Sequence, residues 1–528
     1  MKKHILIVLI VALAFFLRIY KISANPSALN WDEVSHGYNA YSILKTGKDE
    51  WGKPFPIIFR AYGDYKLPVY IYLIAISEFF FGLNEFAVRL PSVLAGTGVV
   101  LFTYLLVNEL FRSKKTALLA ALLMAVEPWS LFLSRVAVEA NVALFFIISG
   151  VYFFVKKKYL PAILLLGVSV WTYNSARVFV PLLLASLHII YKPKLTTNYL
   201  LLATVFLVPM FYQLINPVGQ ARYGAVRILD EGTIAQIVEN RAGLNLPSPI
   251  PRLVHNKATY FVSIVWSNYF THFNPDFLFF KGGSHYQFNV PGHGLLYWIN
   301  VPFLLLGFYL LARNFKEKSS QLILVWLILS PLASSLTREA PHALRSIVML
   351  PAPMILTALG VTYLFKKPIT LLIYIIIVAV FTGSYLRNYF INYRQEYSWS
   401  WQYGYKQAVT YIKENYENYD KIIVTKKYGE PHEFLLFWWP WDPAIYRSDP
   451  NLNRFYQSNW YWVDSFDKFY FVNDWQAKDL VLESGGDINC ADSSCLLITS
   501  PDNAPEGFSK IETINFLDNT PAFEIYAN

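Results

Sequence analysis

The sequence predicts an α-helical polytopic membrane protein, with about eleven transmembrane helices and a small extracytoplasmic domain at its C-terminus. Of the 528 residues, 55% are hydrophobic and only 15% are charged, whereas soluble domains carry about 25% charged residues. Apolar stretches long enough to cross a bilayer recur up to residue 386, and a polar segment follows them. This composition excludes a disordered chain and an ordinary soluble enzyme, and the presence of only two cysteines excludes a Cys-rich metal protein.

The charges are unevenly distributed between these two parts of the chain. Residues 1–386 hold 33 basic and 16 acidic residues, whereas residues 387–528 hold 12 basic and 20 acidic ones. The basic residues of the first part lie between apolar runs and form no continuous stripe. They therefore indicate loops that anchor helices at a cytoplasmic face, and not a protein that binds nucleic acid.

Eleven apolar stretches have about the length of a membrane span. They are residues 4–20, 90–111, 116–133, 140–155, 159–173, 177–191, 198–213, 294–313, 320–336, 346–365 and 368–386.

Short basic clusters separate these stretches, and all of them fall on one side of the membrane when the N-terminus is cytoplasmic, as the positive-inside rule requires. The clusters are Lys2 and Lys3; Arg112, Lys114 and Lys115; Lys156, Lys157 and Lys158; Lys192 and Lys194; Arg313, Lys316 and Lys318; and Lys366 and Lys367.

One further apolar run, 67–82, and the N-terminal run each have an alternative interpretation. A span at 67–82 would reverse the side of every later basic cluster. The run begins with Leu-Pro and contains Glu78, so it predicts a helix in the interface or a re-entrant segment, with an ordinary short span as the alternative. The N-terminal run also fits a cleaved signal peptide, but Arg18 and Lys21 follow it where small residues precede a cleavage site. We therefore expect an uncleaved first span.

An odd number of spans puts residues 387–528 outside the cell, after a transmembrane domain of residues 1–386. This segment alternates short apolar runs with Asp, Asn, Gly and Pro, which predicts a small α/β or mainly β domain. Cys490 and Cys495 lie within it on the oxidising side, so they form either a local disulfide or two free thiols.

Ionisable residues gather in four outer segments, and such residues at the ends of membrane helices are candidates for function. The segments are the first loop, 21–66, and residues 127–141, 171–177 and 338–345. Together they offer carboxylates for base catalysis and Arg, Lys and His side chains for an anion, which suits attack on a phosphate-bearing donor. A Trp beside carboxylates can instead be an interfacial anchor.

Several local patterns have simpler interpretations. Arg135 and Glu139 would share a helix face and pair. Asp49 and Glu50 are expected in a solvated turn. The Gly96-Thr97-Gly98 sequence lies inside a span without a third glycine, and there is no Walker loop and no Asp-x-Asp motif. An ATP-driven pump or a nucleotide-sugar enzyme therefore has no support.

The motifs resemble those of the polytopic GT-C glycosyltransferases related to the protein O-mannosyltransferases and the lipid A aminoarabinose transferase, a family 39-like group. The resemblance covers roughly residues 5–350. It rests on Trp31-Asp32-Glu33, Lys66-Leu67-Pro68, residues 81–92, Ser134-Arg135 with Glu139, residues 171–181 and 269–280, and residues 341–346.

Those families transfer a sugar from a polyprenyl phosphate, bound from the outer face, to an acceptor hydroxyl or phosphate. The resemblance maps their first-loop acidic pair onto Asp32 and Glu33, and their second-loop arginine and acid onto Arg135 and Glu139. The protein O-mannosyltransferases usually carry a β-trefoil in a large outer loop. Residues 214–293 are too short for one, which disfavours a protein acceptor.

We therefore expect an inverting, metal-independent glycosyltransferase at the outer face of a prokaryotic plasma membrane, with no cofactor. Its donor is a polyprenyl-phosphate-linked sugar, and its acceptor is an envelope glycan, lipid or protein. The expected catalytic residues are Asp32 as base, with Glu33 and Glu139 in support; the expected donor phosphate ligands are Lys66, Arg135, Arg177, His342 and Arg345. The alternatives are a lipid or sugar transporter, such as a flippase, and a non-catalytic envelope assembly protein.

Overall fold

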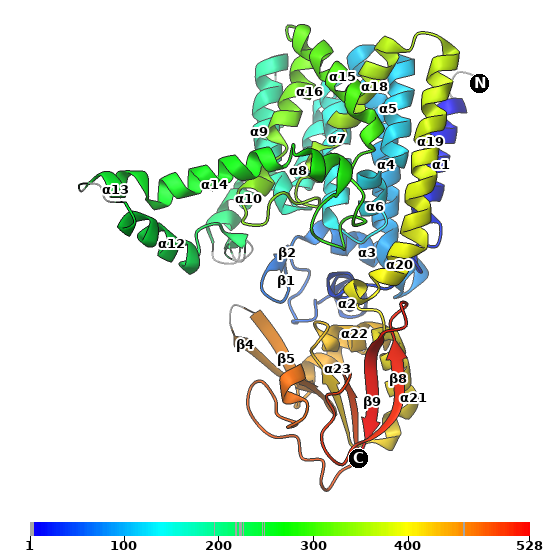
Figure 1. The fold of residues 1–528 in the computed structure, drawn as a ribbon, viewed down its shortest axis with the longest axis vertical. Coiled ribbons are helices and arrows are strands. Elements are labelled where there is room, and N and C mark those ends of the chain that lie inside the picture. The colour runs from blue at the N-terminus through cyan, green and yellow to red at the C-terminus, as the bar shows by residue number, and fades with distance from the viewer. Residues whose placement is uncertain are drawn as a thin grey trace. The chain divides into compact units, whose positions relative to one another are not determined.

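The computed structural model describes residues 5–528 except 195, 217–218, 221–223, 225, 245–246, 248 and 458–459, so Lys2 and Lys3 lie outside it. The chain divides into two compact units (Figure 1). The helical unit comprises Met1–Arg18, Leu94–Ser134 and Glu139–Tyr385, and the mixed unit comprises Ile19–Val93, Arg135–Val138 and Leu386–Asn528.

The helical unit is built mostly from apolar helices, as the composition predicts. Its larger helices, some of which run into the mixed unit, are α1 (Ile5–Ile19), α4 (Glu85–Phe111), α5 (Lys114–Val126), α7 (Glu139–Val155), α8 (Tyr159–Ser169), α9 (Asn174–Tyr191), α10 (Thr197–Ile215), α12 (Glu231–Ala242), α14 (Lys257–Thr271), α15 (Val301–Arg313), α16 (Lys318–Leu329), α18 (Ala352–Leu364) and α19 (Pro368–Phe390). The shorter ones are α6 (Pro128–Leu133), α13 (Ile250–Val254) and α17 (Leu332–Ser335).

Every one of the eleven predicted stretches overlaps a described helix, and the membrane location agrees with the apolar helices. Among the described residues, five helical segments are long and apolar enough to cross a membrane: Glu85–Phe111, Asn174–Tyr191, Thr197–Ile215, Ile347–Leu364 and Pro368–Glu396. The other apolar helices are shorter. The number of spans and their orientation therefore stay predictions.

Proline divides two of the predicted stretches. Residues 116–133 form α5 and α6, with Glu127 between them and Pro128 at the start of α6. Residues 320–336 form α16 and α17, separated at Pro331. Proline lacks the backbone N–H that a continuing helix needs, but it suits the first turn of a new one.

In the mixed unit, the first loop contains a helix and a short hairpin. Helix α2 (Trp31–Thr46) begins with a capping box between Asn30 and Glu33 and ends at Gly47, whose φ of 68° suits glycine. Strands β1 (Phe59–Arg60) and β2 (Tyr65–Lys66) form an antiparallel hairpin. Helix α3 (Pro68–Phe81) follows; its 14 residues span about 21 Å. Whether this short apolar helix lies in the interface stays a prediction.

The C-terminal part of the mixed unit is an α/β domain, which confirms one of the two predicted classes. In the described part of the chain, its sheet has seven strands in the order β4-β5-β6-β3-β7-β9-β8. Strand β3 (Lys421–Thr425) is parallel to both neighbours, β6 (Phe469–Val472) and β7 (Cys495–Thr499). The remaining strands, β4 (Asn453–Gln457), β5 (Trp460–Phe466), β8 (Ser509–Asn515) and β9 (Pro521–Ala527), pair antiparallel.

Helices α20 (Asn392–Glu396), α21 (Tyr405–Asn415), α22 (Pro431–Trp438) and α23 (Pro443–Ser448) complete this domain. Its core includes Ile423, Val472 and Leu497 from the three parallel strands. Cys490 and Cys495 form a disulfide beside that core, which decides between the two alternatives left open by the sequence.

The first loop packs directly on this α/β domain. Helix α2 contacts α22 so closely that a Cβ atom at Gly37 would lie 2.5 Å from the Phe437 ring. The Asp49-Glu50 turn, expected in solvent, is buried, and this expectation is wrong. Arg447 donates to the Asp49 carbonyl over 3.0 Å and Arg454 to the Glu50 carbonyl over 3.2 Å. Burial of the turn therefore results from the domain packed against it.

Candidate active site

The first candidate carboxylate, Asp32, lies in the first turn of α2 and remains accessible. Its side chain is 40% exposed, and its Oδ1 lies 3.0 Å from Lys66 Nζ. The β1–β2 hairpin positions this ammonium group, which also lies 3.7 Å from Asp64 Oδ1. The helix N-terminus and Lys66 both stabilise negative charge on Asp32. An exposed carboxylate in this position can accept a proton from a substrate hydroxyl.

The neighbouring carboxylate, Glu33, is buried and fully engaged. Arg89 donates from Nε to Oε1 and from Nη2 to Oε2, each over 2.9 Å. The Ala137 N–H donates to Oε1 over 2.8 Å, and the Asn30 N–H donates to Oε2 over 3.2 Å. Arg89 also donates to the backbone carbonyl oxygens of Ile22, Pro26 and Ala28. This bidentate pair therefore holds the start of the first loop, and with it Asp32.

Sequence reasoning missed Arg89, although it lies within the segment 81–92 that carries the resemblance. Its position in the first turns of the apolar helix α4 was the available signal, because a charged residue there needs a partner.

Arg135 has a similar positioning geometry. It lies in the turn between α6 and α7, and its guanidinium is buried. Nη2 donates to the carbonyls of Tyr20 and Asn25 over 2.8 and 2.9 Å, and Nε donates to Tyr389 Oη over 3.2 Å. Because α7 begins only at Glu139, the two residues do not share a helix face as expected.

In the helical unit, Arg177 and Arg345 occupy neighbouring segments. Arg177, in the first turn of α9, donates from Nε to the Val170 carbonyl over 3.1 Å and lies over the Trp171 ring. Ser175 Oγ, on the same turn, donates to the Arg345 carbonyl over 2.9 Å. The structure thus brings together the α9 N-terminus and the segment that carries His342 and Arg345.

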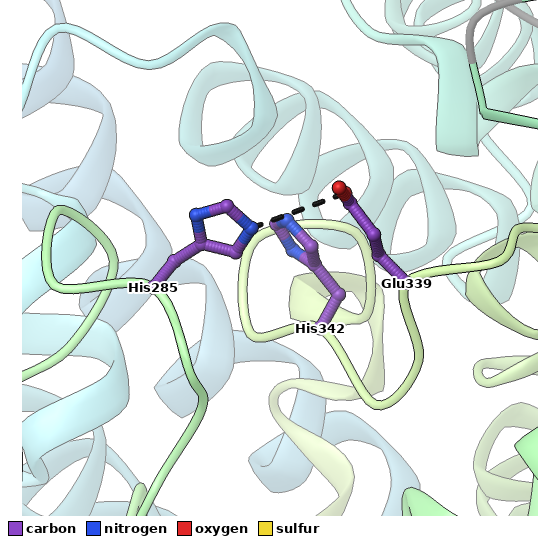
Figure 2. Close-up of side chains that lie close together, drawn as sticks. All are labelled: His285, Glu339 and His342. Carbon is purple, nitrogen blue, oxygen red and sulfur yellow. Dashed lines mark ion pairs between the residues drawn. The ribbon is translucent and has the colours of Figure 1, made fainter.

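That segment forms a cluster with a histidine from far along the chain (Figure 2). Arg345 Nη2 lies 2.8 Å from Glu339 Oε2, and His285 Nε2 lies 3.9 Å from the same oxygen. The His285 and His342 rings lie side by side, with centroids 4.9 Å apart. Trp129 Nε1 donates to the Ala343 carbonyl over 2.9 Å, which fixes the loop.

The charges in this cluster shift its titration. Burial opposes ionisation of Glu339, but the Arg345 guanidinium outweighs it and holds the pKa of that carboxyl below its usual value. Burial lowers the pKa of His285. Near neutral pH, the favoured state is therefore a neutral His285 imidazole next to the Glu339 carboxylate, which is paired with Arg345.

Among the described residues, His285, Glu339 and His342 form the group that could hold a metal ion. One ligand atom each from His285, Glu339 and His342 lies within 4.8 Å of the others. Two imidazoles and a carboxylate are common zinc ligands. Sequence reasoning did not predict this group, because an isolated His285 in a long loop carries no local signal and Glu339 approaches it only in the fold.

The chain is similar to one protein-family model and to several solved structures. Residues 8–173 match the family model described as dolichyl-phosphate-mannose-protein mannosyltransferase. The crystal structure of ArnT from Cupriavidus metallidurans bound to undecaprenyl phosphate is 12% identical, with 99% of this chain and 98% of that chain covered, at a TM-score of 0.58. The chain has the GT-C fold. The predicted resemblance is thereby confirmed.

Two other structural matches complete the comparison. The apo state of the same ArnT gives a TM-score of 0.55 at 11% identity, with 99% and 97% coverage. The apo oligosaccharyltransferase of Archaeoglobus fulgidus is 14% identical over 83% of this chain, at a TM-score of 0.47, and the chain covers 64% of that protein's length. No curated protein matches the chain by sequence.

Some of the candidate site residues lie inside the segment that matches the family model, and others lie outside it. Asp32, Glu33, Lys66, Arg135 and Glu139 lie within residues 8–173, as does Arg89. Arg177, His342 and Arg345 lie outside it.

Proposed function

We propose that this chain is an inverting glycosyltransferase that moves a sugar from a polyprenyl-phosphate donor to an acceptor at the outer face of the membrane. The observation that carries the proposal is Asp32, 40% exposed and paired with Lys66 at 3.0 Å, in a segment that matches the mannosyltransferase family model. An ArnT of the same fold is described as bound to undecaprenyl phosphate, which supports this class of donor.

In the proposed reaction, Asp32 takes the proton of the acceptor hydroxyl while that oxygen attacks the anomeric carbon of the donor sugar. The new bond from oxygen to the anomeric carbon forms as the bond from that carbon to the phosphate oxygen breaks. The electron pair leaves with polyprenyl phosphate. A single displacement of this kind inverts the anomeric configuration.

The leaving phosphate gains negative charge, so fixed cations stabilise the transition state. We propose this role for Lys66, which lies 3.0 Å from Asp32; for Arg177, His342 and Arg345 it stays a prediction from the sequence. A phosphate would compete with Glu339 for Arg345, whose planar guanidinium binds phosphate oxygens in pairs. Glu33 and Arg135 act as positioning residues because both are buried in contacts with the loop, and Glu139 supports the base.

The test is an assay of the purified full-length protein with a panel of polyprenyl-phosphate sugars and envelope acceptors. Release of polyprenyl phosphate that depends on an acceptor supports the proposal. Movement of intact donor across vesicles without release would instead favour a flippase, and no turnover with any donor would overturn the proposal.

A further inference from the structure

The C-terminal domain has a cleft at the carboxyl ends of its parallel strands. Lys426 and Lys427 directly follow β3, and Asn473 and Asp474 directly follow β6. Strands β6 and β7 lie on opposite sides of β3, so the loops that leave these strands diverge. In open α/β sheets, ligands bind in the crevice formed at such a point.

The cleft has the size and lining of a ligand site. Its volume is about 500 Å³, within the range of small-molecule sites. It is lined by Lys426, Lys427, Trp462, Asn473, Asp474, Trp475 and Asn503.

Asp474 organises the polar wall of the cleft. Its Oδ1 accepts hydrogen bonds from Thr425 Oγ1 over 3.2 Å and Ser500 Oγ over 2.5 Å. Its Oδ2 accepts from Asn503 Nδ2 over 3.1 Å and lies 3.3 Å from Lys427 Nζ. A carboxylate, an amide and an ammonium group are thus held in fixed positions around one space, and these groups suit sugar hydroxyls as donors and acceptors.

An exposed indole stands beside this polar wall. Trp475 is 75% exposed, which is unusual for so large an apolar side chain in a domain with a packed core. It immediately follows Asp474 in a short 3₁₀ turn, Asp474–Gln476. An indole face next to hydrogen-bonding groups matches a pyranose ring, which has an apolar C–H face and a polar edge.

The charge balance of the cleft disfavours an anion. Lys426 Nζ lies 2.5 Å from Asp464 and 3.1 Å from Glu483, and Lys427 pairs with Asp474. Each ammonium group is therefore already paired with a carboxylate. A phosphate or nucleotide would have to displace these carboxylates from the lysines, whereas a neutral sugar would not.

We propose that this cleft binds a neutral saccharide and that this saccharide is part of the acceptor. The second half of this inference rests on the proposed transferase function. It assigns the acceptor to the glycans, and it gives the α/β domain the role of acceptor recognition.

The test measures binding by the full-length protein in detergent, without donor. The probes are mannotriose, chitotriose and maltotriose. Their binding is measured by isothermal titration calorimetry and by saturation-transfer NMR. At least one trisaccharide should bind, and Trp475→Ala should weaken that binding about tenfold. Trp266→Ala, which removes another exposed Trp in the helical unit, is the matched control and should leave it unchanged.

Three results would contradict the saccharide cleft. No binding by any of the three probes, unchanged affinity in Trp475→Ala, or tighter binding of inorganic phosphate than of the trisaccharides would overturn the inference. Asp32→Asn should bind the saccharide normally. If a trisaccharide binds but no donor is turned over, the proposed transferase function is wrong and the saccharide cleft stands. If transfer occurs but Trp475→Ala binds the trisaccharide as tightly as the wild type, the saccharide cleft is wrong and the transferase function stands.

Discussion

At the residue scale, two adjacent carboxylates have opposite surroundings. Successive residues of α2 point about 100° apart, so Asp32 pairs with Lys66 and stays 40% exposed, whereas Glu33 is directed into the buried contact with Arg89. The exposed carboxylate is available to a substrate, and the buried one supports the loop. The sequence grouped both as candidates for the same chemistry, because side-chain direction depends on where the helix begins.

Replacing the proposed base should abolish transfer without unfolding the protein. Asp32→Asn keeps the shape but removes the proton acceptor, so we expect a rate loss of about 100- to 10,000-fold in the donor-release assay. Asp49→Asn, in the same loop, keeps the Oδ1 that accepts from Trp51 and Lys53 and should remain active. A fully active Asp32→Asn protein would remove Asp32 as base and make Glu139 the next candidate.

Breaking the buried ion pair should destabilise the first loop. Arg89→Ala leaves the Glu33 carboxylate buried without its main partner, which typically costs about 3–5 kcal/mol. Denaturation in detergent micelles measures the loss. Lys406→Ala breaks the exposed pair with Glu85 and should change stability little. Equal stability of the two variants would show that the Glu33–Arg89 pair has no such role.

The metal-independent mechanism has a direct test at the His285, Glu339 and His342 group. Arg345 already pairs with Glu339 Oε2, so we expect turnover to survive EDTA treatment. Loss of turnover after chelation, restored by Zn²⁺ in the wild type but not in Glu339→Gln, would assign a metal to this group instead.

At the scale of elements, hydropathy located the helices but not their interruptions. Periodic or continuous apolar character is a local property, so each of the eleven stretches contains a helix. Pro128 and Pro331 divide two of these stretches, and this outcome depended on backbone hydrogen bonds that hydropathy does not describe. The contact between α2 and α22 joins residues separated by most of the chain, and no local sequence pattern predicts it.

The contact between α2 and α22 encloses a group of carboxylates whose burial predicts a pH effect. Burial raises the pKa of Glu430 to about 7, although Trp460 Nε1 donates to its Oε1 over 2.6 Å. A raised pKa means that the protonated form is favoured in the fold. The stabilisation is therefore complete below about pH 4.5 and is lost as the pH rises through 7. The buried His432, whose pKa burial lowers, acts in the opposite direction.

Glu430→Gln isolates this effect from that of His432, because Gln resembles the protonated acid and still accepts from Trp460. We expect the variant to match the wild type at pH 5 and to exceed it at pH 8, by up to about 3 kcal/mol. Thermal unfolding followed by circular dichroism at both pH values measures the difference. A variant that is less stable at both values would contradict the prediction.

At the scale of the whole molecule, the distribution of basic clusters predicts the topology. Reporter fusions after Lys115, Lys158, Lys194, Lys318 and Lys367 should all report the cytoplasm, and a fusion after residue 400 should report the outside. A cytoplasmic signal after residue 400 would overturn the scheme. It would also remove the outer face as the place of the proposed reaction.

The sequence by itself determined the membrane class, the helix positions, the α/β or β character of the tail and the resemblance to GT-C glycosyltransferases. These follow from composition, hydropathy and short motifs, which are properties of neighbouring residues. Asp32 and Lys66 could be chosen for the same reason, since each lies in a motif that carries the resemblance.

Only the tertiary structure decided which of these residues meet. It separated the accessible Asp32 from the buried Glu33, assigned Arg89 and Arg135 to the support of the first loop, and brought His285 to Glu339. It also closed the Cys490–Cys495 disulfide and formed the cleft beside Trp475. Contacts between residues far apart in sequence depend on packing and strand order, and these have no counterpart in a local pattern.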